Sequence, residues 1–180
     1  GYGETEASPL THLTSTDDSF AVRTETVGRN LPHQEVKIVD PATNATVPLG
    51  EVGEIYSRGP MLFDEYYKLP EKTAASFKGG WFSAGDLGRK DEDGFFHIVD
   101  RKDNMIITGG ENVYSVEVEN ILYSHPGVFE AAVIGVPDQQ RGEVPKAFIV
   151  LKEGITATEQ EFRRFCHEKI AMYKNPKYFE

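Results

Sequence analysis

Short apolar runs of β-type composition, each closed by a turn signal, dominate the first half of the chain. Val36–Val39 and Glu54–Ser57 predict two strands between turns that contain proline and glycine. Trp81–Phe82 and Phe95–Val99 predict two more, and the polar turn between them favours a hairpin of these two strands. Residues 1–19 are rich in Gly, Ser, Thr and Asp and have no period, which predicts a loop.

Helical patterns are concentrated in the second half. A short helix is expected after Pro70, because proline is favoured in the first helical turn. A longer helix begins at Ser115, where Val118, Ile121 and Leu122 share one helical face. Serine is a good N-cap, so we expect Ser115 to cap this helix.

Three further runs predict strands: Met105–Thr108, Phe129–Val136, which is expected to be buried, and Ala147–Leu151. Thr158 and Glu161 have the spacing of a capping box, which predicts the start of a last helix. Its apolar stripe consists of Phe162, Phe165, Cys166 and Ile170.

The order of these elements predicts an α+β protein in two parts. From about residue 100 the order is strand, helix, strand, strand, helix, which is typical of a small α+β domain. Residues 1–99 are mainly β-rich and are expected to be a separate structural part. We therefore place the domain boundary near Asp100.

Composition narrows the classes of partner. The 180 residues are 39% hydrophobic and 27% charged, with a formal net charge of -10. Such an acidic chain is unsuited to nucleic acid or an anionic membrane, which bind clustered Lys and Arg. No run approaches the ~18 apolar residues of a transmembrane helix. A single cysteine, Cys166, allows no intrachain disulfide, so we expect a cytoplasmic protein in which this thiol is buried and inert.

Three strings contain side chains suited to ligand chemistry. Gly1–Glu6 combines an aromatic ring, a hydroxyl and carboxylates on a glycine-flexible loop. Gly80–Leu87 places an aspartate after a glycine, where it could accept hydrogen bonds from a diol. Val99–Asn112 joins a charged connector to an apolar run and a Gly-Gly break. Each string taken alone is also consistent with an ordinary turn or loop.

In order and in spacing, the three strings together resemble the AMP-forming adenylating enzymes, which include acyl- and aryl-CoA synthetases, nonribosomal adenylation domains and luciferases. The resemblance extends over essentially the whole chain and is strongest to fatty-acid and other acid–CoA ligases. It implies that residues 1–99 are the C-terminal part of a large AMP-binding domain. Residues 100–180 would be most of the mobile C-terminal domain.

The resemblance also implies roles for residues near the nucleotide. Tyr2 would lie against the adenine, and Thr5 would contact the nucleotide phosphate. Glu6 would help to hold Mg²⁺. Asp86 would bind the ribose hydroxyls with help from Arg101. Thr5 and Glu6 are thus the implied catalytic positions of this chain.

A second set of implied roles concerns coenzyme A. Asp103 falls at the hinge about which the small domain swings between two half-reactions. Arg141 would meet the nucleotide phosphates of CoA, since arginine suits phosphate. The channel of the pantetheine arm would be bordered by Thr108, Gly109, Gly110 and Glu111.

The implied reaction uses ATP, a small carboxylic acid and CoA. The carboxylate attacks the α-phosphate of ATP, which gives an acyl-adenylate and pyrophosphate, and a thiol then displaces AMP to give a thioester. The family's phosphate loop would precede Gly1, and its adenylation lysine would follow Glu180 in a motif that the C-terminal domain lacks here. We therefore expect this chain alone to be inactive and, with apolar surface uncovered in residues 1–99, to self-associate.

Two alternatives stay open. The first is an adenylation domain that loads a carrier protein, although the string Gly109–Asn112 favours CoA; a carrier domain beyond Glu180 would support this alternative. A binding module without catalytic activity could use the small α+β domain for protein contacts. The residues do not indicate which carboxylic acid is used.

Overall fold

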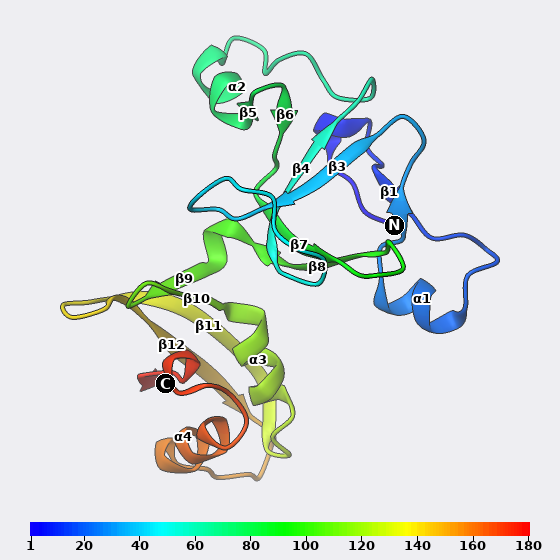
Figure 1. Cartoon of the computed structure of the whole chain (residues 1–180). Helices are drawn as coiled ribbons and strands as arrows, with labels where there is room; N and C mark the ends of the chain where they lie inside the picture. The colour runs from blue at the N-terminus through cyan, green and yellow to red at the C-terminus, as the bar shows by residue number, and fades with distance from the viewer. The chain divides into compact units, whose positions relative to one another are not determined.

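The computed structural model describes residues 1–180, which form two compact units, Gly1–Lys102 and Asp103–Glu180 (Figure 1). Each unit has its own sheet, with short helices alongside, so the predicted α+β class is confirmed. None of the helices has the length and apolar character needed to cross a bilayer.

A six-stranded sheet forms the centre of the first unit, in the order β5-β6-β4-β7-β8 with β3 on β4. Its strands are β3 (Glu35–Val39), β4 (Gly53–Arg58), β5 (Phe77–Lys78), β6 (Trp81–Phe82), β7 (Asp86–Lys90) and β8 (Phe96–Arg101). β4 pairs with β3, β6 and β7, and every residue of β4 except Arg58 is buried. Phe82, Leu87 and Phe96 are almost fully buried and form much of the core.

The predicted hairpin between Trp81–Phe82 and Phe95–Val99 is wrong. β8 pairs with β7, while β6 pairs with β5 and contacts β4 at Ser57. The Asp91 carboxylate accepts a hydrogen bond from the Phe95 amide at 2.8 Å and so closes the β7–β8 turn. Asp86–Lys90 has little β-type composition, which is why local propensity did not identify it as the partner strand.

The predicted loop over residues 1–19 also needs correction. It contains a 3₁₀ turn, η1 (Thr5–Ala7), and a short strand, β1 (His12–Leu13), which pairs with β2 (Arg29–Asn30). Between these strands lies α1 (Phe20–Glu25), where the Ser19 hydroxyl accepts a hydrogen bond from the Val22 amide. The expected helix after Pro70 is α2 (Pro70–Ser76).

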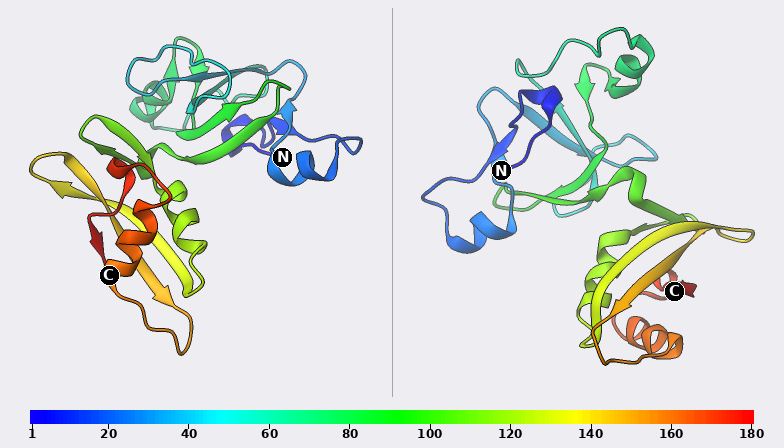
Figure 2. Two further views of the ribbon diagram at one scale, coloured as in Figure 1. Left: turned by 60° about the horizontal axis from the view of Figure 1, so that its bottom comes forward. Right: turned by 180° about the vertical axis from the view of Figure 1, so that it is seen from behind.

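The second unit is built on a five-stranded sheet in the order β10-β9-β12-β11, with β13 parallel to β12. Its strands are β9 (Met105–Thr108), β10 (Glu111–Tyr114), β11 (Val128–Asp138), β12 (Gly142–Leu151) and β13 (Tyr178–Phe179). Figure 2 shows α3 (Ser115–Tyr123) and α4 (Glu159–His167) beside the long β11–β12 hairpin. A last 3₁₀ turn, η3, covers Met172–Lys174.

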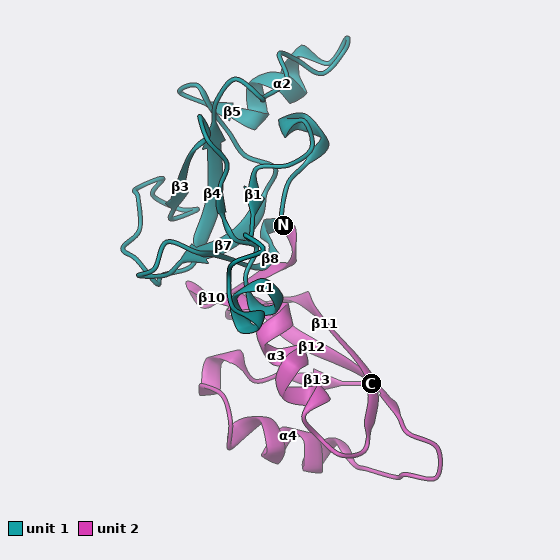
Figure 3. Ribbon diagram, turned by 90° about the vertical axis from the view of Figure 1, so that its right-hand side faces the viewer, with its two compact units in different colours: residues 1–102 teal, residues 103–180 magenta.

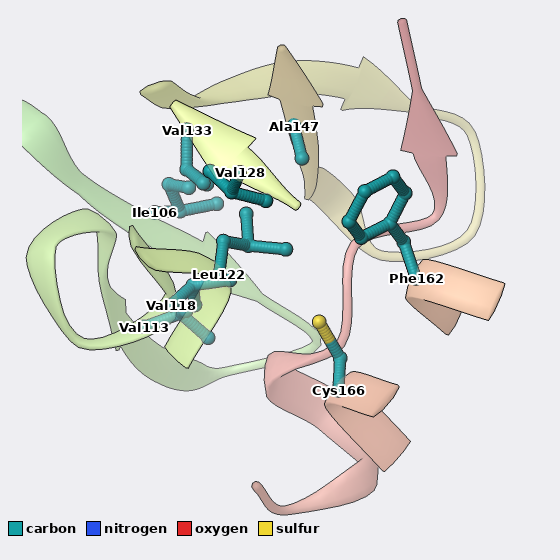
Figure 4. Close-up of a cluster of buried hydrophobic side chains, with 9 residues drawn as sticks. All are labelled: Ile106, Val113, Val118, Leu122, Val128, Val133, Ala147, Phe162 and Cys166. Atoms are coloured by element: carbon teal, nitrogen blue, oxygen red, sulfur yellow. The ribbon is translucent and has the colours of Figure 1, made fainter. Parts of the chain in front are cut away.

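The core of this unit joins both helices to the sheet. Phe162 and Cys166 reach from α4 toward the cluster that includes Leu122 and Ala147 (Figure 4). The predicted capping box is confirmed, because Thr158 and Glu161 exchange side-chain and backbone hydrogen bonds. Burial of Cys166 raises the pKa of its thiol to about 11, which agrees with the predicted inert thiol.

Two local expectations in the second unit are wrong. Phe129 is 61% exposed, because one face of β11 is open and its side chains alternate between core and surface. Ser115 is the first residue of α3, and Tyr114 is the N-cap. The Ser115 hydroxyl donates a hydrogen bond to the Asn104 carbonyl at 2.8 Å, so it ties the helix start to the preceding segment.

The two units separate after Lys102 (Figure 3), a little beyond the predicted boundary near Asp100. Asp100 and Arg101 remain in β8 and pair with Leu87 and Asp86 of β7. The 3₁₀ turn η2 (Lys102–Asn104) follows β8 directly. The charged run therefore begins as part of the sheet of the first unit.

Candidate functional site

A polar pocket of about 520 Å³ lies in the first unit, between its N-terminal loop, α2 and the segment that enters β7. It is lined by three of the four residues predicted to bind the nucleotide, Thr5, Asp86 and Arg101, and by Glu6, the predicted magnesium ligand. The other residues that line it are Gly3, Glu4, Tyr66, Lys72, Ser76, Ser83 and Ala84. Carboxylates, hydroxyls and cations thus face one hollow, which suits a polar, charged ligand.

Asp86 is the centre of the hydrogen bonding at this pocket. Its Oδ2 accepts a hydrogen bond from the Tyr2 hydroxyl at 2.7 Å, and its Oδ1 lies 3.2 Å from Arg101 Nε. Arg101 also donates to the Ala84 carbonyl at 3.0 Å, which fixes the guanidinium beside the carboxylate. Because each carboxylate oxygen has two lone pairs, Asp86 can still accept hydrogen bonds from a ligand.

Tyr2 contacts Asp86 but does not line the pocket. Burial, together with Glu4 and Asp86, raises the pKa of its phenol, so the hydroxyl stays protonated and donates to the carboxylate. Its backbone pairs with His12, and Gly3 passes so close to Pro9 that a Cβ would lie 2.0 Å from that carbonyl oxygen. A glycine is therefore required where the loop turns past its own next segment.

The loop presents two carboxylates with different properties. Glu6 accepts a hydrogen bond from the Tyr66 hydroxyl at 2.6 Å, and this bond lowers the pKa of Glu6. Burial raises the pKa of Glu4, whose Oε2 is buried without a hydrogen-bond partner. No role was assigned to Glu4 from the sequence, although it stands between Tyr2 and Glu6 in the same string.

The donor set fits a magnesium ion that is held mainly by a ligand's phosphates. No group of three or more His, Cys, Asp or Glu side chains is arranged to hold a metal ion by itself. Magnesium commonly takes one or two carboxylates together with phosphate oxygens and water. Glu6, which lines the pocket and whose lowered pKa favours the ionised carboxylate, provides one oxygen donor of that kind.

The second unit contains a separate polar pocket of about 290 Å³, in which Thr108 and Arg141 come together. The Gly109 amide donates to the Arg141 carbonyl at 2.9 Å, so the β9–β10 turn is held against the loop after β11. Gly109 and Gly110 both have positive φ, as this turn requires. Gly109, Gly110 and Glu111 follow Thr108 in the chain, but they do not line the pocket.

Three residues near the end of the chain also line this pocket, and sequence reasoning did not assign them to it: Tyr173, Asn175 and Lys177. Two residues of this lining have a buried side-chain atom without a hydrogen-bond partner, Thr108 Oγ1 and Asn175 Oδ1. Lys177 pairs with Asp138 and, together with the Gln140 and Arg141 amides, lowers the pKa of Asp138 to about 2. In the sequence, Asn175 and Lys177 belong to no motif that predicts a binding site.

Asp103, the predicted hinge, lines a third hollow of about 220 Å³ in the second unit. Glu143 lies at the same hollow, and its Oε2 accepts a hydrogen bond from the Ile107 amide at 3.4 Å. Asp103 is the first residue of this unit. It therefore stands where the chain passes from one unit to the other.

Comparison with known proteins covers both units. The family model described as AMP-binding enzyme matches residues 1–67, and that of the AMP-binding enzyme C-terminal domain matches residues 117–180. A long-chain-fatty-acid–CoA ligase of Bacillus subtilis is 42% identical over 180 residues, which are 100% of this chain and 32% of the relative.

Solved structures agree with this relationship. ATP-bound MatB from Rhodopseudomonas palustris is 38% identical with a TM-score of 0.89, over 99% of this chain and 36% of that one. The o-succinylbenzoate CoA synthetase MenE of Bacillus subtilis, in complex with its acyl-adenylate OSB-AMP, is 37% identical with a TM-score of 0.82, over 99% and 36%. This chain thus spans about a third of the length of these relatives, and it belongs to the superfamily of AMP-forming adenylating enzymes.

Proposed function

We propose that this chain is part of an acid–CoA ligase, with a fatty acid as the expected substrate. The main support is that Thr5 and Glu6, from the start of the chain, line one pocket with the distant residues Asp86 and Arg101. The Bacillus subtilis relative is named for long-chain fatty acids, and MenE is named for o-succinylbenzoate. Both are CoA ligases by name, although their acids differ.

In the first half-reaction the residues of the first unit hold ATP. Asp86 accepts hydrogen bonds from the ribose hydroxyls, and Arg101 keeps that carboxylate oriented. The Thr5 hydroxyl contacts the nucleotide phosphates. The substrate carboxylate attacks the α-phosphate, and pyrophosphate leaves. Glu6 would hold Mg²⁺, which when bound neutralises phosphate charge. Positioning and charge neutralisation supply most of the catalysis in such phosphoryl chemistry.

In the second half-reaction the second unit binds the thiol substrate. Arg141 places a guanidinium at this pocket, which suits the phosphates of CoA, while the neighbouring Lys177 is paired with Asp138. The pantetheine arm would then follow the β9–β10 turn at Thr108, Gly109, Gly110 and Glu111. Rotation about Asp103 would exchange the face of this unit that serves each step.

The function is tested on the full-length parent protein, because this chain spans only about a third of its relatives. AMP release from ATP is measured with and without CoA, across short, medium, long and aromatic acids. CoA-dependent release with long-chain acids is the expected result. Adenylation without CoA-dependent turnover would contradict the ligase and favour the alternative, an adenylation domain that loads a carrier protein.

CoA binding by this chain itself gives a second prediction. A saturating ligand raises the melting temperature, with about 2.7 kcal/mol gained at a hundredfold excess over Kd. Arg141→Ala is expected to weaken CoA binding about tenfold, the effect of one charge-assisted hydrogen bond to phosphate. Thermal shift as a function of CoA concentration measures it.

The matched control is Arg164→Ala, which removes an exposed arginine of α4 outside the pocket. This variant should keep the affinity of the original chain for CoA. Equal CoA affinities of the Arg141 and Arg164 variants would contradict the assignment of Arg141. The absence of any CoA response in all three proteins would favour a binding module of another kind.

A further inference from the structure

A buried carboxylate lies behind the nucleotide pocket, and the proposed reaction does not use it. Glu54, in the central strand β4, is only 4% exposed and does not line the pocket. Its Oε1 accepts a hydrogen bond from the Ser83 hydroxyl at 2.8 Å, and its Oε2 is 2.8 Å from Lys102 Nζ. The two oxygens thus connect two different segments of the first unit.

The first of these segments leads directly to Asp86. The Ser83 hydroxyl, held by Glu54, accepts a hydrogen bond from the Gly85 amide at 3.1 Å. The Gly85 carbonyl in turn accepts a hydrogen bond from the Lys102 amide at 2.7 Å. Residues 83–85 are therefore held from both sides, and this fixes the point at which Asp86 enters β7.

The second segment contains the end of the first unit. Lys102 is the last residue of that unit, and it directly follows Arg101, the residue that pairs with Asp86. Removing one partner from a buried ion pair leaves an uncompensated charge, which is strongly unfavourable. Lys102 is therefore held to the first unit by its side chain, through Glu54, as well as by its backbone amide, through Gly85.

We propose that Glu54 is a positioning residue that fixes the ribose-binding pair and also anchors the end of the first unit. Through Ser83 and Gly85 it sets the position of Asp86, and through Lys102 it sets that of Arg101. The Glu54–Lys102 contact fixes the last residue of the first unit, so backbone rotation between the units would begin at Asp103. This inference rests on the proposed nucleotide site for its functional consequence, but the anchor itself is a property of the first unit.

Glu54→Gln tests the proposal, since it preserves the shape of the side chain and removes its charge. Native-state hydrogen exchange of the Gly85 and Lys102 amides is expected to become about tenfold faster, the factor associated with one lost hydrogen bond to a charged group. The Kd for AMP, measured by calorimetry on this chain, should rise by a similar factor. Amides of the β3–β4 ladder should exchange at an unchanged rate.

Glu35→Gln is the matched control, because Glu35 of β3 forms a two-hydrogen-bond pair with Arg58 of β4 at an exposed position. It should change neither the two amides nor the affinity for AMP. Lys102→Met should reproduce the effects of Glu54→Gln, whereas Lys102→Arg, which keeps the cation, should restore AMP affinity to near the original value. A residue that only stabilised the fold would lower the melting temperature without this pattern of rescue.

The outcomes separate the anchor from the nucleotide site. Unchanged exchange at Gly85 and Lys102 in a folded Glu54→Gln protein would overturn the proposal. Faster exchange with unchanged AMP affinity would also overturn it, since the positioning of Asp86 would then be independent of Glu54. If the original chain binds no AMP, the proposed nucleotide site is contradicted in this chain, and the exchange rates still decide whether Glu54 anchors Lys102.

Discussion

Replacing Asp86 by asparagine is expected to weaken AMP binding by this chain about a hundredfold. The Asp86 carboxylate lines the pocket, and Arg101 Nε lies 3.2 Å from its Oδ1. The remaining lone pairs of the carboxylate can accept hydrogen bonds from a ribose diol. Each hydrogen bond to a charged group contributes about 1.5–3 kcal/mol, and two weakened bonds amount to roughly 3 kcal/mol. Asparagine keeps an oxygen that can accept the hydrogen bond from Tyr2, so the local fold should survive.

Calorimetric titration with AMP measures the effect, and thermal unfolding verifies that the variant is folded. Asp93→Asn is the matched control, because this exposed aspartate lies in the β7–β8 turn outside the pocket. The control should bind AMP like the original chain. A loss of less than about threefold in the Asp86 variant would show that the carboxylate does not hold the ligand.

His12 is expected to make the stability of the first unit strongly dependent on pH. This histidine is fully buried, with its ring 4.4 Å from that of Phe96 and 5.5 Å from that of Tyr2. Its Nδ1 lies 2.9 Å from the Thr11 hydroxyl, and its Nε2 has no partner. Burial, with a smaller contribution from Lys90, lowers the pKa of His12 to about 4.

Because folding lowers the pKa of His12, the free energy of unfolding is expected to fall as the pH falls. Above the unfolded value of about 6.5, His12 is neutral in both states and its contribution to stability is fully present. As the pH falls from about 6.5 to 4, only the unfolded chain takes up the proton, so the folded state loses roughly 3 kcal/mol. Carboxylates with lowered pKa values, such as Asp138, add losses of their own as the pH falls below about 5.

Urea unfolding between pH 7.5 and 4.5 measures this dependence. Trp81 is the only tryptophan, so its fluorescence reports on the first unit alone. His12→Gln should flatten the pH dependence, whereas His33→Asn, which replaces an exposed histidine with positive φ by a residue that tolerates that conformation, should not. Parallel curves for the original chain and the His12 variant would mean that His12 titrates normally in the folded protein.

Local features of the chain could be predicted where a few neighbouring residues decide them. The capping box of Thr158 and Glu161 starts α4 as expected, and Phe162 and Cys166 are buried as their spacing indicates. β3, β4 and β9 also lie where apolar, β-branched runs predicted strands. In each case the signal lies within one turn or one strand, because backbone hydrogen bonding and side-chain spacing are local.

Strand pairing could not be predicted in the same way. Asp86–Lys90 becomes a strand because it completes the ladders of β4 and β8, although its own composition favours no strand. Ser115 is likewise a residue type that favours the N-cap, but it is the first residue of α3 and its hydroxyl donates a hydrogen bond to the Asn104 carbonyl. Tertiary partners outweigh local propensity at both positions.

The sequence by itself determined the α+β class, most of the helices and the order of the strings that identify the superfamily. Only the tertiary structure decided which of their side chains meet. Tyr2 and Asp86 are 84 residues apart, Glu6 and Tyr66 are 60 apart, and Glu54 and Lys102 are 48 apart. Such contacts form only when the sheet brings distant segments together, and the burial that isolates Glu54 and lowers the pKa of His12 arises with them.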